Sequence, residues 1–235
     1  MLNSTTQVLL LGGPDCGKTT LLSSMFYQCV SGGTIRHLLF GGMSHYLINQ
    51  IYYLENCCQK SKEEVFSMSR MHCAQQLDNE TLRYALREYP SRHNIVEFKE
   101  VPFSFIEGYA HTEGYRDKLN QLAKDSDVFI IAVDTPYLME APDSISRRIN
   151  GIDIIQEFLS RIILDNDHGL RGKMVMFVPV KCEKWVKDGN IQEVTKKIRS
   201  SYHTLIERLN LFNKMNICIL PVETIGDVIF LVLSQ

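Results

Sequence analysis

The sequence Gly12-Gly-Pro-Asp-Cys-Gly-Lys-Thr19 follows directly on the apolar run Val8 to Leu11 and matches the pattern Gly-x-x-x-x-Gly-Lys-[Ser/Thr]. Loops with this pattern bind phosphate because successive backbone N–H groups converge on the β-phosphate, while the lysine neutralises β and γ oxygens. The next residues, Thr20 to Phe26, predict a helix whose N-terminal partial positive charge faces the same anion. The succession of strand, loop and helix therefore predicts a site for a nucleoside triphosphate.

Each residue of this loop has an expected task. Lys18 should contact the β- and γ-phosphates and take part in catalysis, and the hydroxyl of Thr19 should bind Mg²⁺. The other loop residues that we expect to contact the nucleotide are Gly13, Asp15, Cys16, Gly17 and Thr20. The thiol of Cys16, beside Lys18 and a helix N-terminus, should have a lowered pKa and react with alkylating agents. The alternative, a chance glycine-rich turn, has a probability on the order of 1% in a chain of this composition.

Length and composition favour a single α/β domain over residues 1–235, because 45% hydrophobic content is enough for a core. The balance of 25 basic and 27 acidic residues gives a net charge of −2, which predicts no nucleic-acid partner. The longest apolar runs, Val128 to Val133 and Val228 to Leu233, are far shorter than the ~20 residues that cross a bilayer, so we expect no membrane insertion. Seven cysteines, an odd number, indicate reduced thiols and a cytoplasmic protein.

Strands and helices alternate along the chain. Beyond the first strand and helix, apolar runs predict strands at 95–98, 102–106, 128–133, 174–180 and 217–222. Spacings of three and four predict amphipathic helices at 115–124, 152–164 and 191–209. This alternation predicts a three-layer α/β fold with a mostly parallel sheet whose carboxyl edge binds the ligand. The connection between 95–98 and 102–106 is too short for a crossover, which predicts a hairpin and one antiparallel edge strand.

The segment 31–93 is too long for a simple loop, and we expect a helical insertion there. The apolar spacing over 47–54 predicts one helix, and that over 65–86 predicts further helical pieces. Cysteines at 57, 58 and 73, with a histidine at 72, could bind zinc, but they lack the Cys-x-x-Cys spacing, which favours buried thiols.

A triphosphate site also needs an acidic residue at the end of a buried strand, which holds Mg²⁺ through water. Glu107, directly after the predicted strand 102–106, is the candidate that we favour. Asp134, which closes the predicted strand 128–133, is the alternative.

Together with the loop, two further segments resemble motifs of the Ras-like GTPase superfamily, over about Gln7 to Phe230. Residues 107–111, Glu-Gly-Tyr-Ala-His, are similar to Asp-x-x-Gly-[Gln/His], with Glu in place of Asp and Ala in place of Gly. Residues 181–183, Lys-Cys-Glu, follow a predicted strand and are similar to the Asn/Thr-Lys-x-Asp motif. The resemblance implies a P-loop NTPase fold with an antiparallel edge strand.

The resemblance also implies roles for individual residues. His111 would orient the attacking water, although it could also be an ordinary polar loop residue. The stem of Lys181 would stack on the purine, and Glu183 would accept from the N1 and N2 hydrogens of guanine; the alternative is a charged loop. Thr224 would lie in the loop that contacts the guanine carbonyl. Candidates for a threonine that senses γ-phosphate are Thr81 and Ser91, and those for an internal arginine finger are Arg87 and Arg92.

Within the superfamily, segments 38–44, 181–185 and 221–226 are similar to the bacterial double-GTPase group. What this implies is a GTP/GDP-binding component of a multi-gene bacterial defence system, with protein partners in a complex. The leading hypothesis is a switch with slow GTP hydrolysis. The alternatives are a nucleotide-bound scaffold without catalysis and a P-loop ATPase or small-molecule kinase.

Overall fold

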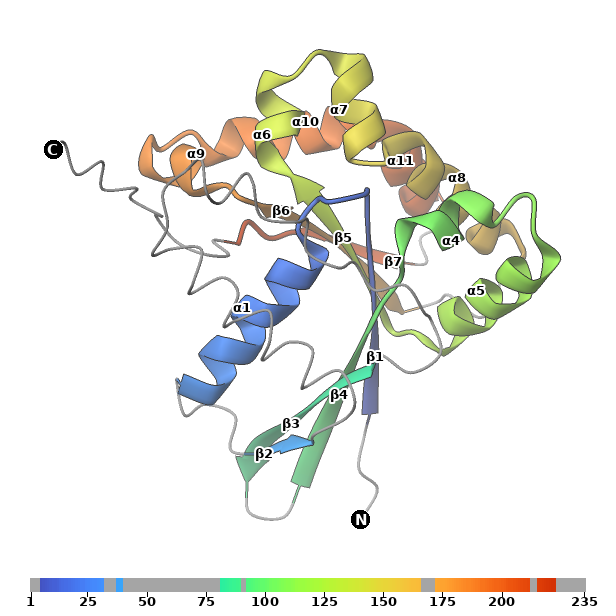
Figure 1. Cartoon of the computed structure of the whole chain (residues 1–235), viewed down its shortest axis with the longest axis vertical. Coiled ribbons are helices and arrows are strands. Elements are labelled where there is room, and N and C mark those ends of the chain that lie inside the picture. Colours follow the sequence, from blue (N-terminus) through green and yellow to red (C-terminus); the bar gives the residue numbers. More distant parts are fainter. Residues whose placement is uncertain are drawn as a thin grey trace, which may run out of the picture.

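The computed structural model of the chain describes residues 5–31, 37–39, 81–89, 92–165, 172–211 and 215–222. Within these ranges, seven strands form one sheet in the order β2-β3-β4-β1-β5-β6-β7, and helices pack on both of its faces (Figure 1). The chain therefore has the expected α/β fold. Most of the predicted insertion and the predicted nucleotide contact Thr224 lie outside the described residues.

Five neighbouring strands of the sheet are parallel. In spatial order they are β4 (Arg92–Glu100), β1 (Thr5–Gly12), β5 (Val128–Asp134), β6 (Lys173–Val180) and β7 (Met215–Ile219). Beyond β4, β3 (Thr81–Tyr89) pairs antiparallel with β4, and β2 (His37–Leu39) pairs antiparallel with β3. Leu10 lies opposite Glu100, and Gly12 lies opposite Ala132. Because of this register, the carboxyl ends of β4, β1 and β5 meet at one edge of the sheet.

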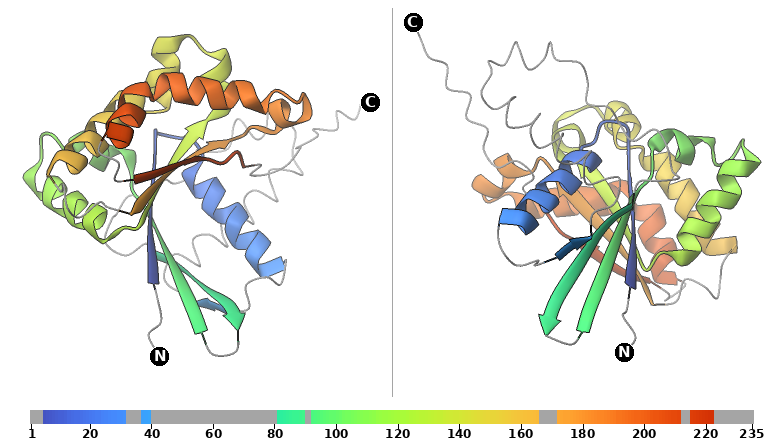
Figure 2. Two further views of the ribbon diagram at one scale, coloured as in Figure 1. Left: turned by 180° about the vertical axis from the view of Figure 1, so that it is seen from behind. Right: turned by 60° about the horizontal axis from the view of Figure 1, so that its bottom comes forward.

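The helices form the two outer layers. On one face lies α1 (Lys18–Ser31), which follows the loop after β1, and the other helices lie around the opposite face (Figure 2). Those helices are α4 (Phe103–Gly108), α5 (Glu113–Asp125), α6 (Thr135–Glu140), α7 (Asp143–Ile149), α8 (Ile152–Asp165), α9 (Glu183–Lys187), α10 (Ile191–Ser201) and α11 (His203–Leu211).

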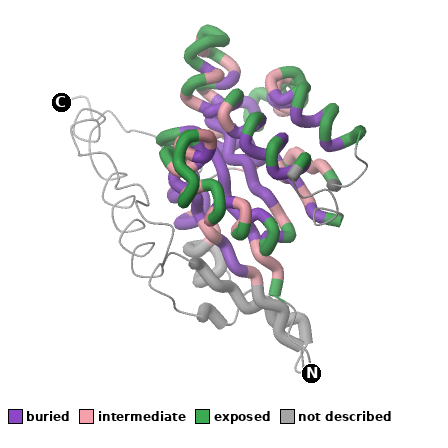
Figure 3. Tube along the Cα trace, turned by 90° about the vertical axis from the view of Figure 1, so that its right-hand side faces the viewer, coloured by how far each residue is buried: buried purple, intermediate pink, exposed green. Residues whose placement is uncertain are grey.

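Strand β1 contributes to both cores because successive side chains of a strand point to opposite faces. Leu10 packs in the core that Leu22 of α1 also joins, whereas Leu9 and Leu11 pack in the core under α8. All four side chains are fully buried. Figure 3 shows buried residues in the middle of the molecule and exposed ones along the outer helices. Each such burial stabilises the fold by roughly 1.5–3 kcal/mol, and a slip of one residue would exchange the two sets, so the register of β1 is strongly specified.

The predicted strand 102–106 is wrong, because these residues begin helix α4. Pro102 is the N-cap residue of α4 and has φ of −60°. Proline lacks the N–H that a strand ladder needs, but the first N–H groups of a helix have no intrahelical partner, so proline is tolerated at a helix start. The hairpin predicted between 95–98 and 102–106 is therefore wrong as well. The partner of β4 is β3, in which Leu82 lies opposite Phe98.

The segment 81–89 was expected to be helical and is a strand. Its apolar residues Leu82 and Leu86 are four apart, which suits a helix, but with Tyr84 between them they also alternate as in a strand. Tertiary pairing with β4 decides between the two readings.

The predicted helix 191–209 is divided into α10 and α11 at Tyr202. Tyr202 has φ of −104° and ψ of 20°, and its buried ring packs against Phe177 of β6 with a centroid distance of 4.9 Å. The short helices α6, α7 and α9 were not predicted. Among the described residues, no helix combines the length and the apolar character that crossing a membrane requires.

Candidate functional site

The loop between β1 and α1 holds a buried ammonium group. Lys18 is 7% exposed, and its Nζ donates to the carbonyl oxygens of Gly12 at 3.1 Å and Gly13 at 2.8 Å. Asp15 and Gly17 have φ of 54° and 100°, so the chain folds tightly around the lysine. A buried ammonium needs such acceptors, and here they hold its charge at the carboxyl edge of the sheet.

Gly13 is required by a close contact between the loop and the end of α7. A Cβ added at Gly13 would lie 1.9 Å from the carbonyl oxygen of Ile149 and 2.7 Å from the carbonyl carbon of Asn150. No side chain fits in this space. The backbone of Ile149 and Asn150 therefore lies directly against the glycine-rich loop.

The hydroxyl of Thr19 lies beside a carboxylate that sequence reasoning missed. Thr19 Oγ1 is 3.1 Å from Oε1 and 3.0 Å from Oε2 of Glu100, to which it donates. Glu100 is the last residue of β4 and only 4% exposed. Extending the predicted strand 95–98 by two residues would have identified Glu100 as the acid at the end of this strand. Glu100 therefore occupies the strand-end position that the sequence analysis assigned to Glu107.

Glu107 and His111 lie elsewhere. Glu107 is an exposed residue of α4 and lines the same pocket as Lys18, but it does not follow a strand. His111 is exposed in the turn between α4 and α5, and its N–H donates to the carbonyl of Gly108 at 3.0 Å. His111 does not belong to the pocket described below. Ser104, which follows Glu100 by the same four residues that separate His111 from Glu107, does line this pocket.

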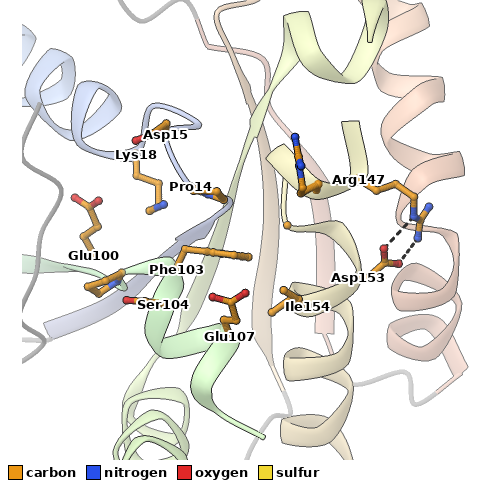
Figure 4. Close-up of a pocket in the computed structure, with 13 residues that line it drawn as sticks. Pro14, Asp15, Lys18, Glu100, Phe103, Ser104, Glu107, Arg147, Asp153 and Ile154 are labelled. Atoms are coloured by element: carbon orange, nitrogen blue, oxygen red, sulfur yellow. Dashed lines mark hydrogen bonds and ion pairs between the residues drawn. The ribbon is translucent and has the colours of Figure 1, made fainter. Parts of the chain in front are cut away.

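The loop opens into a pocket of about 600 Å³ between α4 and the α7–α8 junction (Figure 4). Its lining residues are Pro14, Asp15, Lys18, Glu100, Pro102, Phe103, Ser104, Glu107, Arg147, Arg148, Gly151, Asp153 and Ile154. Charges of both signs surround the space, with the ammonium of Lys18 on the loop side and two arginines on the side of α7. This arrangement suits a ligand that carries phosphate groups together with a metal cation.

Gly151, at the start of α8, lies between an aromatic ring and the loop. A Cβ added there would lie 2.4 Å from Cε2 of Phe103 and 3.3 Å from Cα of Gly13. Figure 4 shows the ring of Phe103 extending across the pocket. The contact ties α4, α8 and the loop together at one point.

On the other side of the loop lies Lys181, the residue that the sequence analysis expected to stack on the purine. Its Nζ forms an ion pair with Asp134, whose side chain is 1% exposed. A Cβ added at Gly17 would lie 3.6 Å from Cε of Lys181, so the lysine stem passes over the loop. Lys181 has φ of 58°, and Glu183 follows as the half-buried first residue of α9.

Asp134, the alternative metal-binding acid, is engaged in structural contacts. Besides Lys181, its carboxylate accepts the N–H of Tyr137 at 3.1 Å and so caps α6. Its backbone N–H donates to Oδ1 of Asn150 at 2.6 Å. These contacts fix the start of α6, and the carboxylate that accepts the hydroxyl of Thr19 is that of Glu100 instead.

The expected reactivity of Cys16 is wrong. Its side chain is fully buried in the core between the sheet and α1, and this burial raises the pKa of the thiol. The charges of Lys18 and Lys181 act in the opposite direction but are outweighed by desolvation. Only the backbone of Cys16 remains available to a phosphate.

The remaining candidates are the residues expected to sense γ-phosphate, to act as an arginine finger or to bind zinc. Thr81 and Arg87 lie on β3 and Arg92 begins β4, while Ser91 lies outside the described residues, as do the cysteines considered for zinc. In the described part of the chain, no group of three or more His, Cys, Asp or Glu side chains could hold a metal ion. The pair of Thr19 and Glu100 is a smaller set, which would leave other ligand positions to phosphate and water.

A comparison with models of known protein families finds none that matches the chain, and a comparison with curated proteins finds no match. A functional interpretation therefore depends on the residues of the site itself.

Proposed function

We propose that this chain binds a guanine nucleoside triphosphate with Mg²⁺, hydrolyses it slowly and acts as a switch for protein partners. The observation that carries the proposal is the pairing of Thr19 with Glu100 beside the buried ammonium of Lys18. Phosphate-binding loop proteins use a hydroxyl, a strand-end acid and a loop lysine for a triphosphate and its metal ion.

The residues present fit Mg²⁺ by their chemistry. Mg²⁺ prefers oxygen ligands and keeps several waters, so it needs few protein groups. Thr19 would bind it through the hydroxyl, and Glu100 would hold it directly or through water. When bound, the ion neutralises charge on the β and γ oxygens. Glu107 lies in the same pocket but does not follow a strand, and we assign it no contact with the ion.

The arrangement of the sheet supports a P-loop fold of the Ras-like kind. The loop follows a central parallel strand, and α1 covers one face alone among the described helices. The resemblance implies one antiparallel edge strand, whereas here two strands with antiparallel pairing, β3 and β2, lie beyond β4. In parallel sheets ligands bind at the carboxyl edge, where this loop lies.

Lys181 supports a preference for guanine. Its stem passes over Gly17, and its ammonium is held by the buried carboxylate of Asp134. The aliphatic part of such a lysine can stack on a purine while Glu183, two residues later, accepts from the hydrogens that guanine offers. Adenine presents an acceptor at N1, so the same carboxylate would repel it.

Two residues in the segment that follows Glu100 favour slow hydrolysis of the nucleotide. Where the related motif has glycine, this chain has Phe103, and where it has Gln or His, this chain has Ser104. A serine hydroxyl is shorter than either and orients an attacking water poorly. These substitutions also favour the second candidate function, a nucleotide-bound scaffold without catalysis. A place in a bacterial defence complex remains a proposal from the resemblance alone.

Equilibrium binding tests the proposal. The wild-type protein should bind GTPγS and GDP in the presence of Mg²⁺, and ATPγS at least tenfold more weakly. Lys18→Ala should weaken GTPγS binding by a factor on the order of 100, because it removes the charge that faces the β and γ oxygens. The exposed Lys196 on α10 provides the control Lys196→Ala, which should bind like the wild type.

If the wild-type protein binds none of the three nucleotides, the proposal as a whole is contradicted. Equal affinity for ATPγS and GTPγS would contradict only the assignment of Lys181 and Glu183 to guanine. Binding without release of phosphate from GTP would favour the scaffold over the switch.

A further inference from the structure

Two consecutive arginines at the end of α7 line the pocket that Lys18 also lines. They are Arg147 and Arg148, and they lie on the wall opposite α4. Neither was among the arginines that the sequence analysis considered. The pocket thus has a loop lysine on one side and a guanidinium-bearing helix end on another.

The contact at Gly13 sets an upper limit on the distance between Arg148 and the loop. The carbonyl oxygen of Ile149 would lie 1.9 Å from a Cβ on Gly13, and Arg148 precedes Ile149 by one residue. With 3.8 Å between consecutive Cα atoms, the Cα of Arg148 lies within roughly 10 Å of the Cα of Gly13. The arginine side chain spans about 6 Å or more on standard bond lengths, so its guanidinium can reach the space in front of the loop.

Lys18 lies on the loop side of the same pocket. Its Nζ is 2.8 Å from the carbonyl oxygen of Gly13, and Pro14, the next residue, lines the pocket. The terminal phosphate of a bound triphosphate would lie near the lysine ammonium. A guanidinium that reaches Gly13 and Pro14 would therefore meet that phosphate.

Arg147 is occupied by another partner. Its Nε donates to Oδ2 of Asp153 at 3.1 Å, and a second guanidinium nitrogen pairs with Oδ1. The hydrogen bonds that Arg147 donates to Asp153 raise the pKa of Arg147, and Figure 4 shows its side chain directed towards Asp153 and away from Lys18. Arg148 is exposed, and among the described residues no hydrogen bond or ion pair holds its side chain.

We propose that Arg148 contacts the γ-phosphoryl group of the bound nucleotide and stabilises the charge that develops during hydrolysis. This inference rests on the proposed function and names a residue that acts in it. Arg147, paired with Asp153, links the end of α7 to the first turn of α8.

The role of Arg148 is electrostatic. During hydrolysis the water oxygen forms a bond to the γ phosphorus, and the bond from that phosphorus to the β–γ bridging oxygen breaks. The electron pair of the broken bond stays on GDP, and the proton of the water ends on the released phosphate. A guanidinium neither gives nor takes a proton here, since its N–H groups only donate hydrogen bonds to the phosphoryl oxygens.

The test compares Arg148→Ala and Arg148→Lys with the wild type. Single-turnover hydrolysis of GTP by Arg148→Ala should fall by a factor on the order of 100 or more. The second readout is binding of GDP with aluminium fluoride, a mimic of the phosphoryl group in transfer. The wild type should bind GDP more tightly when aluminium fluoride is present, and Arg148→Ala should lose this gain while its affinity for GDP alone stays within about twofold.

Two further variants make the test specific. Arg148→Lys keeps the charge but loses the forked donors, so it should restore only part of the rate. Arg161, an exposed arginine of α8 that pairs with Glu157, gives the matched control Arg161→Ala, which should hydrolyse GTP at the wild-type rate.

The outcomes separate this inference from the proposed function. If the wild type binds GTPγS and Arg148→Ala keeps both the rate and the response to aluminium fluoride, only the role of Arg148 is overturned. If the wild type binds nucleotide but shows neither hydrolysis nor that response, the role of Arg148 is likewise overturned and nucleotide binding stands. If the wild type binds no nucleotide, both are overturned.

Discussion

The hydroxyl oxygen of Thr19 lies 3.0 Å from Oε2 of Glu100, although 81 residues separate the two in the chain. The pairing exists because β4 lies beside β1, with Glu100 opposite Leu10, two residues before the loop begins. Parallel pairing therefore delivers the carboxylate to the first turn of α1. This relationship identifies Glu100, rather than Glu107, as the acid that we expect beside the metal.

Glu100→Gln should reduce the dependence of nucleotide binding on Mg²⁺. The amide keeps the size of the side chain but removes the negative charge that would help hold the cation. We expect the gain in GTPγS affinity on adding Mg²⁺ to fall at least tenfold, which is about 1.4 kcal/mol. Titrations with Mg²⁺ and with EDTA measure it. Glu107→Gln is the control and should behave like the wild type; the reverse pattern would return the role to Glu107.

Gly13→Ala should destabilise the fold. The new methyl group would lie 1.9 Å from the carbonyl oxygen of Ile149, so the end of α7 has to move. Overpacking of this kind costs about 1–3 kcal/mol in the free energy of unfolding, which urea denaturation measures. Gly114→Ala is the matched control, because Gly114 lies in α5 and a Cβ there meets nothing within 4 Å. That variant should gain about 0.5–1 kcal/mol, and equal effects of both would argue against the contact.

Lys181→Met should cost more stability than Asp134→Ala. The carboxylate of Asp134 is 1% exposed, whereas the side chain of Lys181 is 42% exposed and can be hydrated when alone. Removing the lysine leaves a buried charge without its ion-pair partner, which costs about 3 kcal/mol. Removing the aspartate loses chiefly the cap of α6, about 1 kcal/mol. Denaturant unfolding of both variants checks the order, and Lys181→Met combined with Asp134→Asn should recover part of the loss.

Cys16 should resist alkylation in the folded protein. Because burial raises the pKa of its thiol, the thiolate fraction at any pH from 7 to 9 is smaller than in an unfolded chain, and the side chain is inaccessible as well. Iodoacetamide followed by mass mapping of the peptide that contains Cys16 should show labelling only after denaturation. The partly exposed Cys218 serves as an internal reference. Rapid labelling of Cys16 in the native state would mean that its side chain faces the site.

Local patterns predicted the parts of the fold that depend on local interactions. The strand before the loop, helix α1 and the amphipathic helices α5 and α8 are confirmed, because a long periodic or motif-bearing segment has one way to bury its apolar face. The run 102–106 was ambiguous, since five mostly apolar residues fit a strand or a buried helix equally well. Its proline, which cannot donate to a ladder, decides for the helix.

That one error moved the predicted site along the chain. Placing a strand at 102–106 put the strand-end acid at Glu107 and the residue four positions later at His111. With β4 ending at Glu100, the same spacing selects Ser104. The contact between Gly13 and Ile149, and with it the position of Arg148, depends on how α7 packs on the loop. No periodicity or motif in the sequence carries that information.

The glycine at 151 joins three segments that the chain order keeps apart, since the ring of Phe103 lies on one side of it and Gly13 on the other. A rotation of α4 that withdrew the ring would open a void beside the loop, and filling the pocket would act back on the orientation of α4. Thermodynamic coupling between two sites is reciprocal. If an anion bound in the loop changes the affinity of the outer surface of α4 for a protein partner, that partner changes the affinity of the loop for the anion by the same factor.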